Sequence, residues 1–513
     1  MGSALQVLWL KRDLRVRDHR PLVKACEVAA GGGPPVVPLY VFEPSYWAAR
    51  EHSAPQLAFI LECLEKLGSA LRARGGDLFV RVGELPEVLE ALHGQRPIAR
   101  LLSHRETGTR ITFDRDLRVK AWCEAQGVPW EESDQTGVVR RLGSRDGWAS
   151  RWTQRMRRPL LPAPEHVPVP GDLERGVLPA PATLGVVPRP LSERQLGGEE
   201  QGLATLKSFL RTRGVNYRAD MATPNAGWDG CSRLSPYLAF GALSMKRVHQ
   251  ETERRQQALQ RKKRDGRLDD PRWLDSIASF RSRLSWHCHF MQKLEDEPAL
   301  EFENMNRAFD GLREDALDAA TRRARLEAWR AGRTGYPLVD ACMRCVEATG
   351  WLNFRMRAMV VAFASYQLWL HWREPALHLA GCFVDYEPGI HFSQMQMQSG
   401  TTGINALRIY SPIKQTRDND PEGAFIHRWV PELRALPAPH LDKPWETPPL
   451  LQRQLDVVIG RDYPAPIVEH ATAYREAKQK MFAARGSLEA RAASDGVMRR
   501  HGSRKRPTRR RRS

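Results

Sequence analysis

The chain has 513 residues, of which 42% are hydrophobic and 27% are charged, and its formal net charge is +19. This composition is typical of a globular protein with several domains, each able to bury a core. No apolar run reaches about eighteen residues, so a membrane-spanning helix is excluded. The start of the chain lacks the pattern of a secretory signal, and the eight cysteines are scattered. We therefore expect a reduced, cytoplasmic protein without membrane partners.

The first 135 residues alternate short apolar runs with helical patterns. Strands are predicted at Leu5–Leu10, Val36–Phe42, Asp77–Val82 and Ile98–His104. The segments between them place apolar residues at helical spacing. Strands and helices in this alternation predict an α/β domain, residues 1–135, built on a doubly wound parallel sheet. Such folds bind ligands at the carboxyl edge of the sheet.

The remaining chain divides into three parts. Residues 136–199 are rich in proline and lack periodicity, which predicts an interdomain linker. Residues 200–480 show amphipathic helical patterns and almost no strand signals, so a large all-α domain is expected. Residues 481–513 are predicted to form a basic, disordered arm, because the last seventeen residues hold nine Lys or Arg and no acid. The positive charge favours a polyanion such as DNA as a partner.

Several segments resemble DNA photolyases and cryptochromes. VLWLKRDLRVRDHRPLVKA near the start is similar to the family's opening motif, and GCSRLSPYLAFGALS (230–244) is similar to its flavin phosphate loop. RTGYPLVDACMRCVEATGWLNFRMRAMVVAFASYQLWLHWREP (333–375) and FIHRWVPEL (425–433) resemble the helical core and a closing helix. The resemblance runs to about residue 480. It implies a light-driven, FAD-dependent deoxyribodipyrimidine photo-lyase, a carbon–carbon lyase that repairs cyclobutane pyrimidine dimers in damaged duplex or single-stranded DNA.

The resemblance also assigns residues to the flavin. Tyr217 and the phosphate loop, in which Cys231 replaces a threonine, would bind the phosphates, and Arg357 and Asp385 would pair beside the isoalloxazine ring. His391 would stand near flavin N5, in the motif DYEPGIH, where many relatives carry asparagine. The expected flavin-binding residues are Tyr217, Cys231, Ser232, Arg233, Leu234, Ser235, Arg357, Asp385, Tyr386, Glu387 and His391.

Other positions depart from the family pattern. Trp372 matches the middle tryptophan of an electron-transfer chain, whereas Met395 stands at the proximal position. The substrate pocket would comprise Arg283, Trp286, His287, Phe354 and Met397, with Trp286 stacking on the flipped dimer. The pair Asn353-Phe354 replaces the His-His of (6-4) photolyases, which argues against the (6-4) mechanism.

Three further points concern ligands and alternatives. HRETG at His104 lies at a strand end, where a second, antenna chromophore of the folate or deazaflavin type can bind in this family. No metal site is expected, because Cys342 and Cys345 lack further ligands. A monomer is expected. Two alternatives stay open: a cryptochrome-like blue-light photoreceptor that binds FAD without repair, and a DNA-binding protein with a structural flavin.

Overall fold

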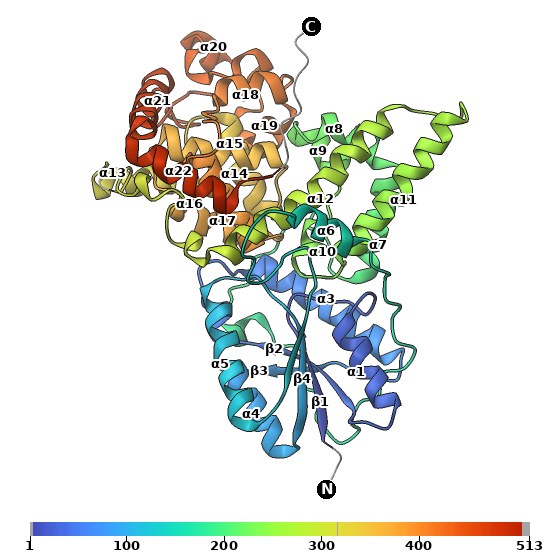
Figure 1. The fold of residues 1–513 in the computed structure, drawn as a ribbon. Helices are drawn as coiled ribbons and strands as arrows, with labels where there is room; N and C mark the ends of the chain where they lie inside the picture. The colour runs from blue at the N-terminus through green and yellow to red at the C-terminus, as the bar shows by residue number, and fades with distance from the viewer. Residues whose placement is uncertain (1–3, 315, 505–513) are drawn as a thin grey trace.

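The computed structural model describes residues 4–314 and 316–504 and consists of a sheet domain and a helical domain (Figure 1). The sheet is parallel, with the order β3-β2-β1-β4-β5. Its strands are β1 (Leu5–Leu10), β2 (Val36–Phe42), β3 (Phe79–Val82), β4 (Ile98–His104) and β5 (Trp130–Ser133). This confirms the predicted α/β fold. The sequence prediction missed β5, because this edge strand is half-exposed and carries two glutamates, which strands disfavour.

Both faces of the sheet are covered by helices. These are α1 (Arg20–Ala30), α2 (Pro44–Trp47), α3 (Ala54–Arg72), α4 (Leu85–Gln95) and α5 (Arg110–Gln126). Alternate residues of β1 enter two different cores: Val7 and Trp9 pack with residues of α4 and α5, whereas Leu8 and Leu10 pack with residues of α1 and α3. The second core continues into the helical domain, so the two domains share buried apolar contacts.

The segment predicted as a linker contains an α-helix, α6 (Trp148–Met156), and a short 3₁₀ helix, Pro181–Leu184. Trp148, Trp152 and Met156 are spaced four residues apart and are buried, which holds this helix against the rest of the protein. The irregular chain that follows runs along the sheet domain, where the amide of Val36 donates to the carbonyl of Pro168 at 2.8 Å. The segment is therefore docked onto both domains.

The second domain is helical, as predicted, and lies above the sheet domain in Figure 1. Its first helices are α7 (Glu199–Arg211), α8 (Tyr217–Asp220), α9 (Pro224–Gly230), α10 (Ser235–Ala239), α11 (Met245–Arg264), α12 (Arg272–Asp296) and α13 (Ala319–Arg330). They are followed by α14 (Pro337–Thr349), α15 (Phe354–Ala362), α16 (Arg373–Cys382), α17 (Pro388–Ser399), α18 (Pro412–Asn419), α19 (Ala424–Trp429) and α20 (Pro449–Gln454). Among the described helices, none combines the length and the hydropathy required to cross a bilayer.

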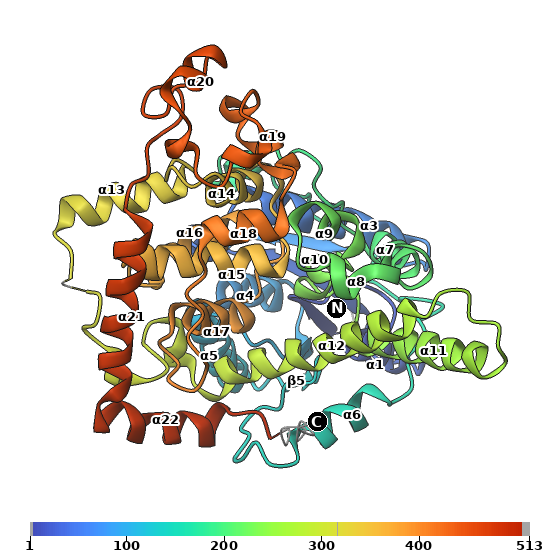
Figure 2. The same cartoon turned by 90° about the horizontal axis from the view of Figure 1, so that it is seen from above.

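The C-terminal segment corrects the prediction of a disordered arm from residue 481. Helix α21 (His470–Gly486) continues past that point, and α22 (Leu488–His501) follows it. Ala490, Val497 and His501 of α22 are buried. The two helices run along the outer edge of the molecule, and the chain after α22 approaches α6 (Figure 2). Tertiary packing thus orders a segment whose composition alone indicated disorder, while residues 505–513 lie outside the described residues.

Candidate functional site

The structure brings Arg357 and Asp385 together, as the sequence predicted. Arg357 lies on α15, and Asp385 lies in the turn between α16 and α17. Two parallel hydrogen bonds, Nη1 to Oδ1 at 3.0 Å and Nη2 to Oδ2 at 2.9 Å, join them. The guanidinium also covers the ring of Phe383, 3.9 Å from its centroid. Asp385 is buried and Arg357 is a quarter exposed, so the pair is held rigidly at the edge of the helical core.

Arg233 of the predicted phosphate loop lies beside this pair. Its backbone adopts a left-handed conformation, with φ of 57°. Its guanidinium is stacked between the rings of Trp228 and Trp351, at 4.2 and 3.9 Å from their centroids. Burial lowers the pKa of Arg233 to about 10, while the charge of Asp385 opposes that shift. The two tryptophans were not predicted as site residues, because no motif in the sequence connects them to Arg233.

The other residues of the predicted loop are buried or half-buried. Leu234 is buried, and Ser232 and Ser235 are half-buried. Ser235 begins α10, which is only five residues long. Burial raises the pKa of the Cys231 thiol to about 12. Tyr217 is buried against the rings of Phe209 and Phe280.

The turn that begins α17 gathers three predicted residues. The Nε2 of His391 lies 2.8 Å from the carbonyl oxygen of Ala376 and donates to it, which leaves Nδ1 unprotonated. Burial lowers the pKa of His391 to about 4, so the ring is neutral near pH 7. The ring of Tyr386 meets that of His391 edge-on at 5.2 Å. Burial raises the pKa of Glu387 to about 7, although the charge of Arg12 opposes this.

Arg12, in the first motif of the chain, links the two domains. Its Nε donates to the carbonyl of Ala239 and its Nη2 to the carbonyl of Tyr386, both at 2.7 Å. Its Nη2 also lies 3.3 Å from Oε2 of Glu387. The motif is evident in the sequence, but this arginine had no predicted role, because its partners lie more than two hundred residues away.

The predicted substrate residues lie on α12, α15 and α17. Arg283, Trp286 and His287 are on α12, and the guanidinium of Arg283 lies 5.7 Å from the ring centroid of Phe354. Phe354 is 41% exposed and Trp286 is half-buried, so aromatic surface faces outward here. Burial lowers the pKa of His287 to about 4. We call Arg283, Trp286 and Phe354 the aromatic mouth.

Met397 and Trp372 are two further residues that the sequence predicted for the site. Met397 is half-buried on α17, and Met395, on the same helix, is buried. Trp372 is fully buried and donates from Nε1 to Oδ1 of Asn304 at 2.8 Å. Its ring centroid is 6.4 Å from that of Phe392. Phe392, not an oxidisable tryptophan or tyrosine, is thus the α17 ring beside Trp372.

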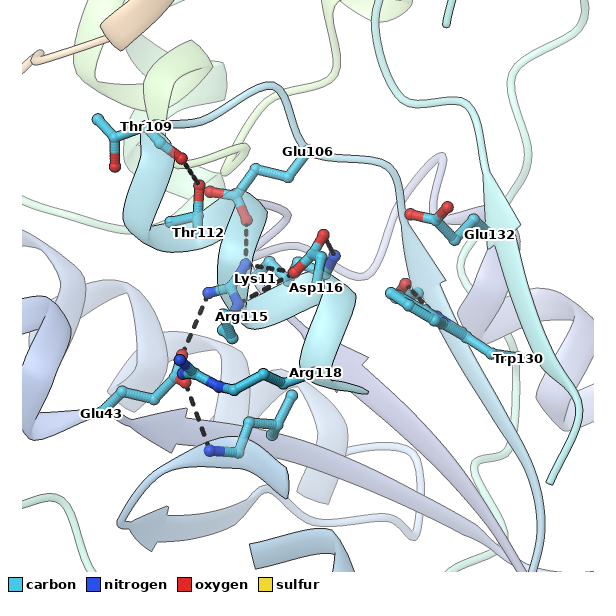
Figure 3. Close-up of polar contacts among 12 residues, drawn as sticks. Lys11, Glu43, Glu106, Thr109, Thr112, Arg115, Asp116, Arg118, Trp130 and Glu132 are labelled. Atoms are coloured by element: carbon cyan, nitrogen blue, oxygen red, sulfur yellow. Dashed lines mark hydrogen bonds and ion pairs between the residues drawn. The ribbon is translucent and has the colours of Figure 1, made fainter. Parts of the chain in front are cut away.

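A separate cavity of about 800 Å³ opens where the chain leaves β4, between the sheet domain and α12. Residues 105–110 and 140–145 line it, together with α5, Trp130 and the end of α12. Two of the lining residues, Glu106 and Asp116, belong to the polar network of Figure 3, in which Arg115 bonds to Glu43, Glu106 and Asp116. We call this cavity the interdomain pocket. His104 lines a smaller neighbouring cavity, which shares Glu106 with the interdomain pocket and also reaches His287 and Glu387.

Comparison with known proteins identifies the family. Residues 6–144 match the family model "DNA photolyase", and residues 280–483 match "FAD binding domain of DNA photolyase". A protein named cryptochrome DASH from Gloeobacter violaceus is 31% identical over 91% of this chain and 94% of its own length. A deoxyribodipyrimidine photo-lyase from Halobacterium salinarum is 29% identical over 94% and 100%. The chain belongs to the DNA photolyase and cryptochrome family. A solved bacterial class III photolyase from Agrobacterium tumefaciens shares the fold, with a TM-score of 0.81 and 24% identity over 95% of this chain and 99% of its own.

The site residues fit the FAD that this family domain binds. Several buried polar atoms have no hydrogen-bond partner among the described residues. Four belong to predicted site residues, namely Arg233 Nη1, His287 Nδ1, Tyr386 Oη and Glu387 Oε1. Two more, Asn353 Oδ1 and Ser393 Oγ, belong to residues that were not predicted. Unpartnered buried polar atoms are costly and therefore rare in proteins. A dinucleotide with phosphates, ribityl hydroxyls and a heteroaromatic ring supplies donors and acceptors for such atoms.

Two clusters in the family fold hold three potential metal ligands each among the described residues: Asp13, His19 and His104, and Glu347, His378 and Cys382. In the first, the carboxylate of Asp13 already accepts from the backbone of Lys11 at 2.8 Å and lies 2.7 Å from Nδ1 of His104. In the second, Glu347 pairs with Arg189. Hydrogen bonds and ion pairs therefore account for both clusters.

Proposed function

We propose that the chain repairs cyclobutane pyrimidine dimers in DNA by a light-driven reaction that uses FAD. The aromatic mouth is the observation that carries this proposal. Arg283 and Trp286 are three residues apart on α12 and so lie on one face of the helix. A guanidinium and two partly exposed aromatic rings suit a flipped dinucleotide, because bases stack on aromatic rings and phosphates bind guanidinium groups. Relatives named deoxyribodipyrimidine photo-lyase support the same assignment.

The protein's part in this reaction is binding, orientation and electrostatics. Bound FAD, when reduced and excited by light, would lend the electron that splits the dimer and would take it back after the split. The ion pair of Arg357 and Asp385 would lie beside the isoalloxazine ring of FAD. The guanidinium of Arg233 would bind the FAD phosphates. Neutral His287 and His391 contribute hydrogen-bonding nitrogens without adding charge. No side chain is required as a nucleophile.

We propose that DNA binds as a partner of a monomer, through phosphate contacts and a flipped lesion. The net charge of +19 supports sequence-independent binding to phosphates. A damaged dinucleotide is poorly stacked and therefore flips out at modest cost.

We also propose that the interdomain pocket binds an antenna chromophore. Its volume is within the range of small-molecule sites. Phe113 and Leu117 of α5 line it and are about half exposed, at 48% and 50%, which leaves apolar surface for a planar ring. The smaller cavity beside it extends to His287 and Glu387, which supports a short path for energy transfer to the flavin.

The decisive experiment is a repair assay on the FAD-loaded, reduced protein. Oligonucleotides that contain one cyclobutane dimer, in duplex and in single strands, are illuminated with blue light or kept dark. We expect repair only in the light. Retention of FAD with no repair of either substrate would overturn the proposal and favour the photoreceptor alternative. The relatives named cryptochrome DASH, and Met395 at the proximal tryptophan position, support that alternative.

The role of the mouth is tested separately by Trp286→Ala. Loss of one stacking ring lowers affinity for the dimer by about tenfold to a hundredfold, while affinity for intact DNA hardly changes. The measurement is a pair of titrations on a variant shown to retain FAD. An unchanged ratio of the two affinities contradicts the assignment of Trp286. A parallel fall of both would assign it to the core.

A further inference from the structure

We propose that helix α22 forms one wall of the interdomain pocket and that Arg499 binds an anionic group of the molecule held there. The inference rests on the proposed chromophore site and adds to it the chemical class of the ligand: a planar ring that carries an acidic substituent. It also gives a role to the C-terminal segment, which lies beyond the part that resembles the family motifs.

The position of α22 is set by contacts with the helical domain. Val497 packs in a small core with Leu294, Leu300 and Met305. The side chain of Asn306 donates to the carbonyl of Ala490 at 3.1 Å. These contacts place Arg499 and Arg500 in the lining of the pocket. The helix is thus a built part of the cavity.

The end of α22 is fixed to both sides of the pocket by charge pairs. Arg500 and His501 lie 2.9 and 2.6 Å from Oε2 of Glu297, which directly follows α12. Arg504 pairs with Asp146 at 2.7 Å, next to the 140–145 loop that lines the cavity. The chain therefore spans from one wall of the pocket to another.

The charges that line the pocket are unbalanced in favour of cations. Every lining carboxylate has a partner: Glu106, Asp116, Glu132, Glu295 and Asp296 pair with basic side chains, and Glu301 accepts from the backbone amide of Arg110. Arg141 and Arg499 also line the pocket, and neither has an ion-pair partner among the described residues. Two uncompensated guanidinium groups at one cavity favour an anion.

The apolar side of the pocket defines the other half of the ligand. Phe113 and Leu117 are exposed on α5, and Trp130 is half-buried on β5. A planar ring that contacts these side chains removes their apolar surface from water. An acidic substituent on the ring then reaches the unpaired arginines. Pterins with glutamate tails and flavin phosphates share this chemistry.

The test compares wild type, Arg499→Glu and Arg491→Glu as FAD-loaded proteins. Arg491 is a matched control, because it is exposed on the same helix and does not line the pocket. One pair of probes is FMN and riboflavin, which differ by a phosphate. The second pair is methenyltetrahydrofolate with one or with several glutamates. Binding is measured by equilibrium dialysis. Energy transfer is measured by exciting the added ring and recording the response of the bound FAD.

We expect the more acidic member of at least one pair to bind wild type about tenfold more tightly, the size of one charge-assisted contact. Arg499→Glu should abolish this preference, and Arg491→Glu should retain it. Arg499→Ala, which introduces no new charge, should reduce the preference partly. Thermal midpoints should be equal in all variants, since Arg499 is exposed and has no ion-pair partner among the described residues.

Three results would overturn the inference. If the acidic and neutral members of each pair bind equally, α22 does not select an anion. The same follows if Arg499→Glu and Arg491→Glu bind the probes alike. In both cases, a ring that binds and transfers energy still supports the chromophore proposal. If no ring binds to wild type, the chromophore proposal fails first, and the inference fails with it.

Discussion

At the residue scale, Asp385 accepts two hydrogen bonds from one guanidinium, so its charge is matched within the helical core. Asp385→Asn removes that charge and leaves Arg357 without compensation. Breaking a buried pair in this way destabilises a folded protein by about 3–5 kcal/mol. Because Arg357 is a quarter exposed, we expect a value near the lower end of that range. We expect FAD retention to weaken at least about tenfold, measured as flavin absorbance per chain after gel filtration.

Asp275→Asn serves as the control for this prediction. It makes the same chemical change in the exposed pair of Arg218 and Asp275. Exposed pairs contribute little, so flavin content should stay at the wild-type level. Equal flavin content in both variants would contradict a role for Asp385 in holding the cofactor.

His391 predicts a pH dependence of stability. Burial lowers its folded-state pKa from 6.5 to about 4, so between these values the unfolded chain binds more protons than the folded one. This contribution to stability is complete above pH 6.5 and declines as the pH falls towards 4. Across these roughly 2.5 pH units, the loss in the free energy of unfolding from this histidine reaches about 3 kcal/mol.

His391→Asn should therefore lose less stability than wild type between about pH 7 and about pH 4.5, as measured by urea unfolding. His166→Asn, at an exposed position, should keep the wild-type dependence. Parallel curves for wild type and His391→Asn would show that this histidine does not titrate across unfolding.

At the element scale, α22 behaves as part of the helical domain. Its removal exposes the apolar surface that Val497 covers and leaves the amide of Asn306 without its partner. We expect deletion of residues 487–513 to lower the thermal unfolding midpoint by about 5 °C, because burying one such side chain contributes about 1.5–3 kcal/mol.

Deletion of residues 505–513 is the matched truncation, since it keeps all of α22. It should leave the midpoint within about 1 °C of wild type. A loss of stability shared equally by both truncations would contradict the packing role of α22.

At the scale of the whole molecule, the positive charge is divided between a folded and a terminal part. Three of the nine terminal cations, Arg499, Arg500 and Arg504, belong to α22 or follow it directly, and six lie in residues 505–513. A test of DNA binding by the tail must therefore begin at residue 505, because an earlier cut at Val497 would also remove buried contacts.

Replacing the six terminal cations by glutamine, at constant length, should weaken binding to duplex DNA. The slope of log affinity against log salt should become shallower by about 0.9 for each phosphate that the tail no longer neutralises. Flavin content and thermal midpoint should not change. A wild-type slope in this variant would show that DNA is bound by the folded domains alone.

The amino-acid sequence by itself determined the strands β1, β2 and β4, the change from an α/β to a helical domain, and the pairing of Arg357 with Asp385. Strands and helices are set by local periodicity, and the pair lies within motifs that the family resemblance identifies. Such features depend on local sequence patterns, so they can be predicted without knowing which distant segments contact each other.

The tertiary structure decided the rest. The stacking of Arg233 between Trp228 and Trp351, the reach of Arg12 to Glu387, and the docking of α22 all join segments that are far apart in the chain. Burial against distant partners also converted a polar C-terminal segment from predicted disorder into a helix. Local propensity is a weak preference that long-range packing overrides, and these contacts exist only once the two domains have come together.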